Sequence, residues 1–315
     1  MYKAVAFIQS LLLLSTITSA QTITQTFGSG ANVFSIDFVE IGNPGNPANT
    51  TSSPNPVGSV PYIYNLGKYE ISRDIVTKAN ALGGLGITLQ DMTNYGGNSA
   101  SRPATGISWN EAAKFVNWLN TSKGFQAAYQ FSTDGSSIVL WESGKYSGNN
   151  QFRNKNAYYF LPSIDEWFKG AYVNRINGYS AYATGSDSVP VAVSGSTSAN
   201  TTVFNQNEFS GPADVNNAGG LSFYGTMGQG GNASEILETA NDGANNSPNE
   251  NRMKRGGSWY FNNFLASNVT GEFFTSPSAE WIDQGFRVAS VPEPSAVSLL
   301  AVGLGGLALV RRRRA

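Results

Sequence analysis

Glycine interrupts this sequence so often that long regular elements have little room to form. The chain has 35 glycines in 315 residues, and much of the sequence between its motifs is glycine, asparagine and serine with scattered aromatic residues. These small residues favour turns and weaken the interior of helices and strands. We therefore predict a single α+β domain of short strands and few helices joined by long ordered loops.

Two stretches nevertheless carry complete helix signals. In "SWNEAAKFVNWLNTSKG", Ser108 can cap the first turn, Glu111 stands at the capping-box position and Gly124 follows the end. In "SIDEWFKGAYVN", Ser163 and Glu166 repeat the same box. We predict two main helices at these places.

The N-terminal residues have the layout of an export signal. "MYKAVAFIQSLLLLSTITSA" has a short basic start, an apolar centre and small residues at its end, so we predict residues 1–20 to be a signal peptide. Residues 21–60 combine strand-like "NVFSIDFVEI" with the loop "GNPGNPANTTSSPNP". We expect a hairpin and long loop there, as part of the main domain.

The C-terminal residues resemble a membrane-stop sequence. Residues 295–310 carry no charge, and they are followed at once by Arg311, Arg312, Arg313 and Arg314. As a helix, this stretch reaches about 24 Å, a little short of a hydrocarbon core of about 30 Å. We predict a transmembrane segment here, with the arginines in the cytoplasm. The part of the chain between the signal peptide and this segment, which we call the body, would then lie outside the cytoplasmic membrane.

Composition excludes several kinds of chemistry. The chain has no cysteine and no histidine, which removes disulfides, thiolate nucleophiles and the commonest ligands of transition metals. Residues 21–290 carry 15 basic and 20 acidic side chains, a balance of −5. We therefore expect no nucleic-acid partner. Any catalysis would rest on carboxylates, hydroxyls, lysine or tyrosine.

The tail resembles the PEP-CTERM sorting signal of Gram-negative bacteria. The resemblance rests on an ordered set of three parts: the triplet Pro292, Glu293 and Pro294, the apolar stretch, and the four arginines. It implies that an exosortase-type membrane protease cleaves residues 291–315 from the body. The protein would then be anchored in the inner membrane first, and reach the cell surface or an extracellular matrix rich in exopolysaccharide.

The body is similar to the sulfatase-modifying factor family, which includes the formylglycine-generating enzymes. The motifs that carry the resemblance, in family order, are "GKYEIS", "RPATGISWNEAAKFVNWLN", "YFLPSIDEWFKGAY", "GQGGNASEI", "KRGGSW" and "GFRVA". The resemblance places the domain at residues 61–290 and implies a variant of the C-type-lectin-like fold.

The resemblance also implies that the family's oxidase activity is absent. The formylglycine-generating enzymes bind copper through two cysteines shortly after the Gly-Gly-Ser turn, and Phe261 and Ala266 stand at those positions. The arginines that the family carries just beyond are missing too. We therefore expect no copper and no formylglycine-generating activity.

A family calcium loop is kept in part. Its Asn and Glu ligands correspond to Asn232 and Glu235, while Ser234 and Ile236 replace two tryptophans. The resemblance makes Asn232 and Glu235 candidate calcium ligands, since this ion prefers oxygen; the alternative is an Asn and a Glu on a solvated loop. Asn200 matches the Asn of a second ion site, but no carboxylate follows it at the expected spacing.

Two functions fit these observations. The first is a non-catalytic binding or structural module at the cell surface or in the matrix, without catalytic residues. The alternative is an enzyme that acts on extracellular polysaccharide through a carboxylate pair, either Asp165 with Glu166 or Glu235 with Glu238. The sequence does not identify the ligand.

For the binding function, the resemblance places the ligand on the surface after the Gly-Gly-Ser turn. Rings that alternate between core and solvent, beside amides, suit a glycan or a surface protein. The candidate residues are Trp259, Phe261, Asn262, Asn263 and Trp281. The alternative site is a hairpin around Trp141.

Overall fold

The computed structural model describes residues 22–174, 178–262 and 273–292. The predicted signal peptide, Asn263, Ala266, and the tail from Glu293 to Arg314, including the predicted transmembrane segment, lie outside this range. Within the described ranges, no helix is both long and apolar enough to span a bilayer.

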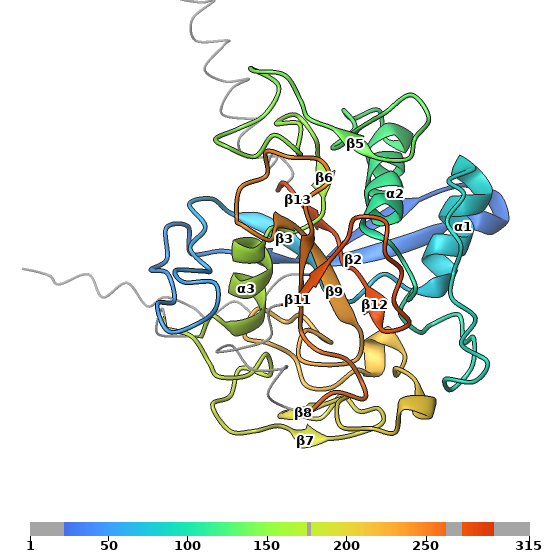
Figure 1. The fold of residues 1–315 in the computed structure, drawn as a ribbon. Coiled ribbons are helices and arrows are strands. Elements are labelled where there is room, and N and C mark those ends of the chain that lie inside the picture. The colour runs from blue at the N-terminus through green and yellow to red at the C-terminus, as the bar shows by residue number, and fades with distance from the viewer. Residues whose placement is uncertain (1–21, 175–177, 263–272, 293–315) are drawn as a thin grey trace, which may run out of the picture.

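A five-stranded sheet joins the two ends of the described chain (Figure 1). Its strand order is β1-β2-β3-β13-β6, and every neighbouring pair is antiparallel. The strands are β1 Thr22–Phe27, β2 Phe34–Ile41, β3 Tyr64–Gly67, β13 Ala289–Ser290 and β6 Tyr159–Phe160. The opening hairpin of β1 and β2 therefore shares one sheet with the last strand of the domain.

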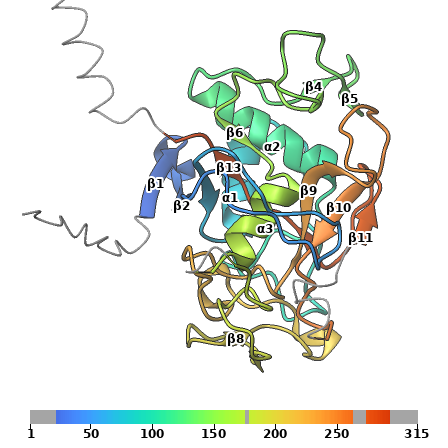
Figure 2. The ribbon, with the colours of Figure 1, turned by 90° about the vertical axis from the view of Figure 1, so that its left-hand side faces the viewer.

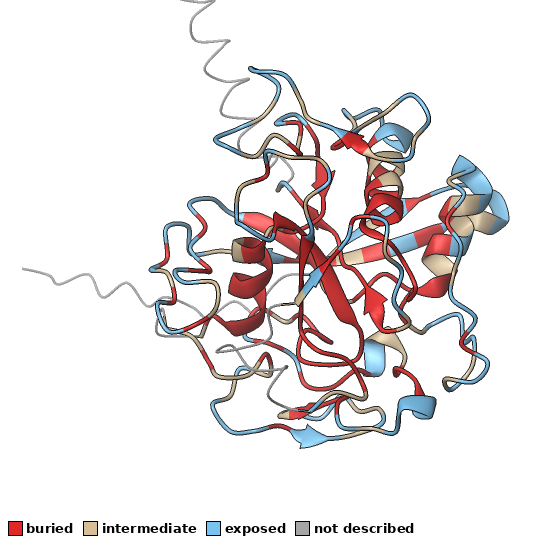
Figure 3. Ribbon diagram, viewed as in Figure 1, coloured by how far each residue is buried: buried red, intermediate tan, exposed pale blue. Residues whose placement is uncertain are grey.

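A four-stranded sheet lies at the centre of the molecule (Figure 3). Its order is β11-β10-β9-β12, with β12 parallel to β9. The strands are β11 Phe273–Thr275, β10 Arg252–Arg255, β9 Ser234–Ala240 and β12 Gln284–Gly285. All seven residues of β9 are buried although four of them are polar or charged, so their polar groups must find partners inside the protein.

The remaining elements are short. Two small ladders pair β4 Gln130–Phe131 with β5 Ile138–Val139, and β7 Val191–Ala192 with β8 Thr201–Thr202. Single 3-10 turns lie at η1 Gly30–Asn32, η2 Glu208–Ser210 and η3 Val215–Asn217. Long loops connect these elements (Figure 2), which confirms the expected α+β fold of short strands and ordered loops.

Both predicted helices are present, and each begins with the predicted capping box. They are α2 Trp109–Ser122 and α3 Ile164–Tyr172. In α2 the Ser108 hydroxyl accepts a hydrogen bond from the Glu111 amide, and the Glu111 carboxylate accepts one from the Ser108 amide at 2.9 Å. Ser163 and Glu166 do the same for α3.

The prediction of two main helices was incomplete, because a third one, α1 Arg73–Gly83, precedes them. Its local signals are in the sequence: Ser72 accepts a hydrogen bond from the Ile75 amide, and Gly84 ends the helix in the left-handed conformation. Helix α1 buries Val76 and Ala79 beside α2. The expectation missed it because no family motif covers it.

Asn120 on α2 closes the outer edge of the five-stranded sheet. Its amide donates to the Tyr159 carbonyl at 2.8 Å, and its carbonyl oxygen accepts from the amides of Tyr158 and Tyr159 at 2.9 Å. The Tyr129 hydroxyl accepts from the Leu161 amide at 2.8 Å. The exposed edge of β6 is thus occupied by side chains, which prevents another strand from pairing there.

Asn120→Ala is expected to lower the free energy of unfolding by about 2–4 kcal/mol, since it leaves buried backbone groups of β6 without partners. Asn246→Ala, at an exposed position, is the matched control and should change little. Urea unfolding of both variants measures the difference. Equal stability of the two variants would contradict the role assigned to Asn120.

Candidate functional site

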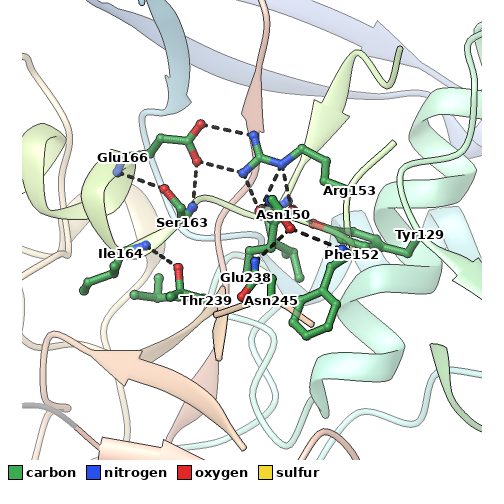
Figure 4. A network of polar contacts seen from close by, with 12 residues as sticks. Tyr129, Asn150, Phe152, Arg153, Ser163, Ile164, Glu166, Glu238, Thr239 and Asn245 are labelled. Carbon is green, nitrogen blue, oxygen red and sulfur yellow. Dashed lines mark hydrogen bonds and ion pairs between the residues drawn. The ribbon is translucent and has the colours of Figure 1, made fainter. Parts of the chain in front are cut away.

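A largely buried arginine, Arg153, joins two buried carboxylates (Figure 4). Arg153 Nη1 and Nη2 donate to the two oxygens of Glu166 on α3 at 3.1 and 3.0 Å. Arg153 Nε and Nη2 donate to Glu238 on β9 at 2.8 and 2.6 Å. Both carboxylates are completely buried. We call these three residues the Arg153 triad.

The other contacts of the triad come from neighbouring loops. The Tyr62 hydroxyl donates to Glu166 Oε1 at 2.7 Å, and the Tyr129 hydroxyl donates to Glu238 Oε1 at 2.9 Å. The Asn150 amide donates to Glu238 Oε2 at 2.5 Å. Each carboxylate oxygen therefore accepts at least two hydrogen bonds, which satisfies buried charge.

Electrostatics keep Arg153 and Glu166 charged. Burial would lower the pKa of Arg153, but the charges of Glu166 and Glu238 hold it well above its usual value. Burial would raise the pKa of Glu166, but the Arg153 guanidinium brings it below 4.5. Burial and the Glu166 charge together raise the pKa of the Tyr62 hydroxyl, so it stays a donor.

A cavity of about 880 Å³ lies in front of the triad. Its walls come from residues 54–64, the loop at 147–157, the start of α3 and the residues after β9, and they include Arg153 and Tyr62. Asp165 on the same wall accepts a hydrogen bond from the Gly58 amide at 2.7 Å, and burial raises the pKa of its carboxyl. This cavity was not predicted from the sequence.

The predicted calcium loop holds a second buried ion pair. Glu235 Oε1 and Oε2 accept from Arg287 Nη2 and Nε, both at 2.6 Å, and Oε2 also accepts from the Trp167 indole at 2.7 Å. Asn232 Oδ1 accepts from the Ala213 amide at 2.8 Å. Both residues are fully buried, so the alternative of a solvated loop is wrong.

These residues do not fit a calcium ion. Every side-chain oxygen of Asn232 and Glu235 already accepts from a protein donor, and the Arg287 guanidinium occupies the place where Glu235 would meet a cation. The neighbouring Glu70 accepts from Asn232 and Ala233, and burial, followed by the charge of Glu235, raises its pKa well above its usual value. Calcium binding itself stays a prediction, and the geometry argues against it.

The Gly-Gly-Ser turn follows β10. Gly256 and Gly257 have φ angles of 98° and 69°, and a Cβ at Gly256 would lie 2.9 Å from the Gln229 carbonyl oxygen, so this turn requires glycine. Trp259, which follows, is fully buried and its indole donates to the Glu208 carbonyl at 2.8 Å. Trp259 is therefore a core residue and not part of a ligand surface.

The other residues of the predicted ligand surface differ in exposure. Phe261 is half-buried, and its ring stacks on Phe273 with the centroids 6.0 Å apart. Asn262 is exposed, and Trp281 is 56% exposed. The structure shows no contact between Trp281 and Phe261 among the residues it describes, and Asn263 lies outside them.

Comparison with known proteins now decides the family. The model of the sulfatase-modifying factor enzyme 1-like domain matches residues 68–291, and the PEP-CTERM protein-sorting motif matches residues 290–314. The chain belongs to the sulfatase-modifying factor enzyme 1-like family. It also carries a PEP-CTERM motif. A search of curated proteins finds no match.

Solved structures share this fold. Treponema denticola variable protein 1 is 17% identical, with a TM-score of 0.57 over 86% of this chain and 99% of its own. CarF is 19% identical, with a TM-score of 0.57 over 82% and 99%. PvdO from Pseudomonas aeruginosa is 14% identical, with a TM-score of 0.51 over 85% and 98%. At this identity the likeness establishes the fold alone.

In the structure, three of the acids that the sequence suggested as catalytic pairs contact arginines. Glu166 and Glu238 meet through Arg153, while Glu235 meets Arg287. Neither suggested pair, Asp165 with Glu166 or Glu235 with Glu238, shares a hydrogen-bonding partner in the described part of this sulfatase-modifying factor-like domain. The roles of both arginines were not predicted from the sequence, because Glu238 lies 85 residues from Arg153 and Glu235 lies 52 residues from Arg287.

Arg153→Met is expected to lower the free energy of unfolding at pH 7 by about 3–5 kcal/mol, because two buried carboxylates lose their cation. The stability that Glu166 contributes in the unaltered protein is present above pH 4.5 and is lost as the pH falls through its depressed pKa. In the variant, protonation of Glu166 removes a buried charge that has lost its arginine, so the variant is penalised less at low pH. The difference in free energy of unfolding between the unaltered protein and Arg153→Met should therefore shrink as the pH falls. An equal loss of stability at every pH would contradict the ion pairing.

Removal of calcium with a chelator is expected to leave the thermal unfolding midpoint unchanged, because Arg287 supplies the positive charge beside Glu235. Differential scanning calorimetry with and without added calcium measures this. A rise in the midpoint with calcium would revive Asn232 and Glu235 as ligands.

Proposed function

We propose that the exported body is a non-catalytic binding module of the cell surface or extracellular matrix. The observation that carries this proposal is the aromatic packing of Phe261 on Phe273. The family resemblance places a copper-binding cysteine of the formylglycine-generating enzymes at Phe261. A benzene ring cannot bind copper or exchange a thiol, so an apolar surface replaces the reactive centre.

The buried acids also support a non-catalytic role. A general acid or base needs a proton that it can exchange with a substrate, and a pKa near the working pH. Glu166, Glu235 and Glu238 are instead engaged by arginines over both oxygens. Asp165, which lines the cavity, is not held by an arginine in the described part of the chain, but its suggested partner Glu166 is. This pair therefore supplies at most one exchangeable acid for the alternative of a polysaccharide-degrading enzyme.

Copper uptake and cysteine oxidation test whether the protein lacks the oxidase activity of the formylglycine-generating enzymes. The purified protein is expected to take up no stoichiometric copper and to leave a sulfatase-peptide cysteine unoxidised, because the chain has no cysteine. Metal analysis and peptide mass spectrometry measure both. Turnover above a protein-free control would overturn it.

Sorting by an exosortase-type protease follows from the PEP-CTERM motif at residues 290–314. Protein released to the cell surface should lack the apolar stretch and the four arginines, and Glu293→Gln should leave the protein in the membrane fraction. Intact mass spectrometry and membrane fractionation test this. A released form that retains Arg311 to Arg314 would contradict processing.

The ligand surface is proposed at Phe261, Asn262 and Trp281, with an extracellular glycan or surface protein as partner. Phe261→Ala and Asn262→Ala should each weaken binding of the protein to the extracellular polymer of its host at least about fivefold. Asn246→Ala is the control. Unchanged binding by both variants, with folding intact by circular dichroism, would remove this surface from the proposal.

A further inference from the structure

The cavity in front of the Arg153 triad shares no lining residue with the proposed surface after the Gly-Gly-Ser turn. Its volume of about 880 Å³ falls in the range of about 300–1,000 Å³ that is usual for ligand sites. We propose that it is a second binding site, which takes an oligosaccharide without acidic groups.

An aromatic ring forms one wall of the site. Tyr62 is 46% exposed although its ring is large and apolar, and it lines the cavity. Its hydroxyl is bound to Glu166, and its ring meets Tyr64 edge-on with the centroids 6.1 Å apart. The ring is thus held in place before a ligand arrives, which suits stacking on the apolar face of a sugar.

Amides with unused hydrogen-bonding capacity form the rim. Asn149 and Asn241 line the cavity and are exposed, and among the described residues their side chains make no hydrogen bond. Asn150 and Asn245, which also line it, are instead bonded to each other at 2.8 Å. Amides both donate and accept, as sugar hydroxyls do.

Charge selects against an acidic ligand. The positive charge of Arg153 is offset by the two carboxylates of the triad behind the wall. The wall itself carries Lys155 against Asp165 and Asp242. Asp165 has one bonded oxygen, Oδ1, and its Oδ2 accepts no hydrogen bond within the described chain. An added carboxylate or sulfate would meet net negative charge, whereas hydroxyl or amine donors would find acceptors.

A peptide is a weaker candidate for the same site. Extended peptides bind mainly by adding a strand to an open sheet edge. The edge strand beside the cavity is β6, whose Phe160 lines it. Asn120 and Tyr129 occupy the backbone groups on the outer side of β6, so no ladder is available there.

The test uses the full chain in a zwitterionic detergent that has no sugar headgroup, on an array of hexasaccharides. The array holds three kinds of member. Cellohexaose is an uncharged member, the glucosamine hexamer is the amine-bearing member, and the galacturonic acid hexamer is the acidic member. Binding is expected for an uncharged or amine-bearing member and not for the acidic one. Titration calorimetry then gives the affinity for the best member.

Variants place the site. Tyr62→Ala should weaken binding at least about tenfold, because the stacking ring is lost. Tyr62→Phe, which keeps the ring and loses only the bond to Glu166, should stay within about threefold. Asn241→Ala should cost about fivefold, while Asn246→Ala outside the cavity and Phe261→Ala at the other surface should leave the affinity unchanged.

Three results would overturn the inference: no binding by any uncharged or amine-bearing member, equal binding of the acidic hexamer, or full affinity in Tyr62→Ala and Asn241→Ala. Binding that is lost in Phe261→Ala alone would also overturn it, and would leave the proposed surface after the Gly-Gly-Ser turn standing. Selective binding of peptides from a library at the cavity, without any sugar binding, would also overturn the inference.

Discussion

The ion pairing of Arg153 with Glu166 and Glu238 is the constraint on which the rest of the domain depends. It ties the loop at 147–157 to the first turn of α3 and to the centre of β9, and these segments belong to different parts of the fold (Figure 4). Two buried carboxylates without their cation would be costly. The pairing therefore connects the wall of the cavity to α3 and to the central strand β9.

A second arginine repeats this arrangement at the other end of β9. Arg287 engages Glu235 and donates to the carbonyls of Gly67 and Met227, so it connects β9 with β3 and with the loop before the Gly-Asn motif. Trp167 from α3 completes the contact. Acids that look like catalytic or metal-binding groups in the sequence thus hold a buried strand in place, and this structural role supports the proposal that the protein acts by binding.

Local signals predicted part of this structure. Ser108 with Glu111 and Ser163 with Glu166 lie three residues apart, so their capping boxes can be read directly from the sequence. The family motifs predicted the fold and the glycine turn before Trp259. The Arg153 triad could not be predicted in this way, because Glu238 lies 85 residues from Arg153 and only the tertiary fold brings them together. The burial of Trp259 and the cavity at Tyr62 likewise depend on loops without regular structure.

The charge state of Glu166 tests the central claim, that the buried acids are structural, most directly. Carbon-detected NMR of the glutamate carboxyl groups across pH, with Glu166→Gln to assign the signal, measures its pKa in the folded protein. The ion pairing predicts a titration midpoint below 4.5. A midpoint above that value, as a general acid near neutral pH requires, would contradict the account and restore a catalytic reading of the site.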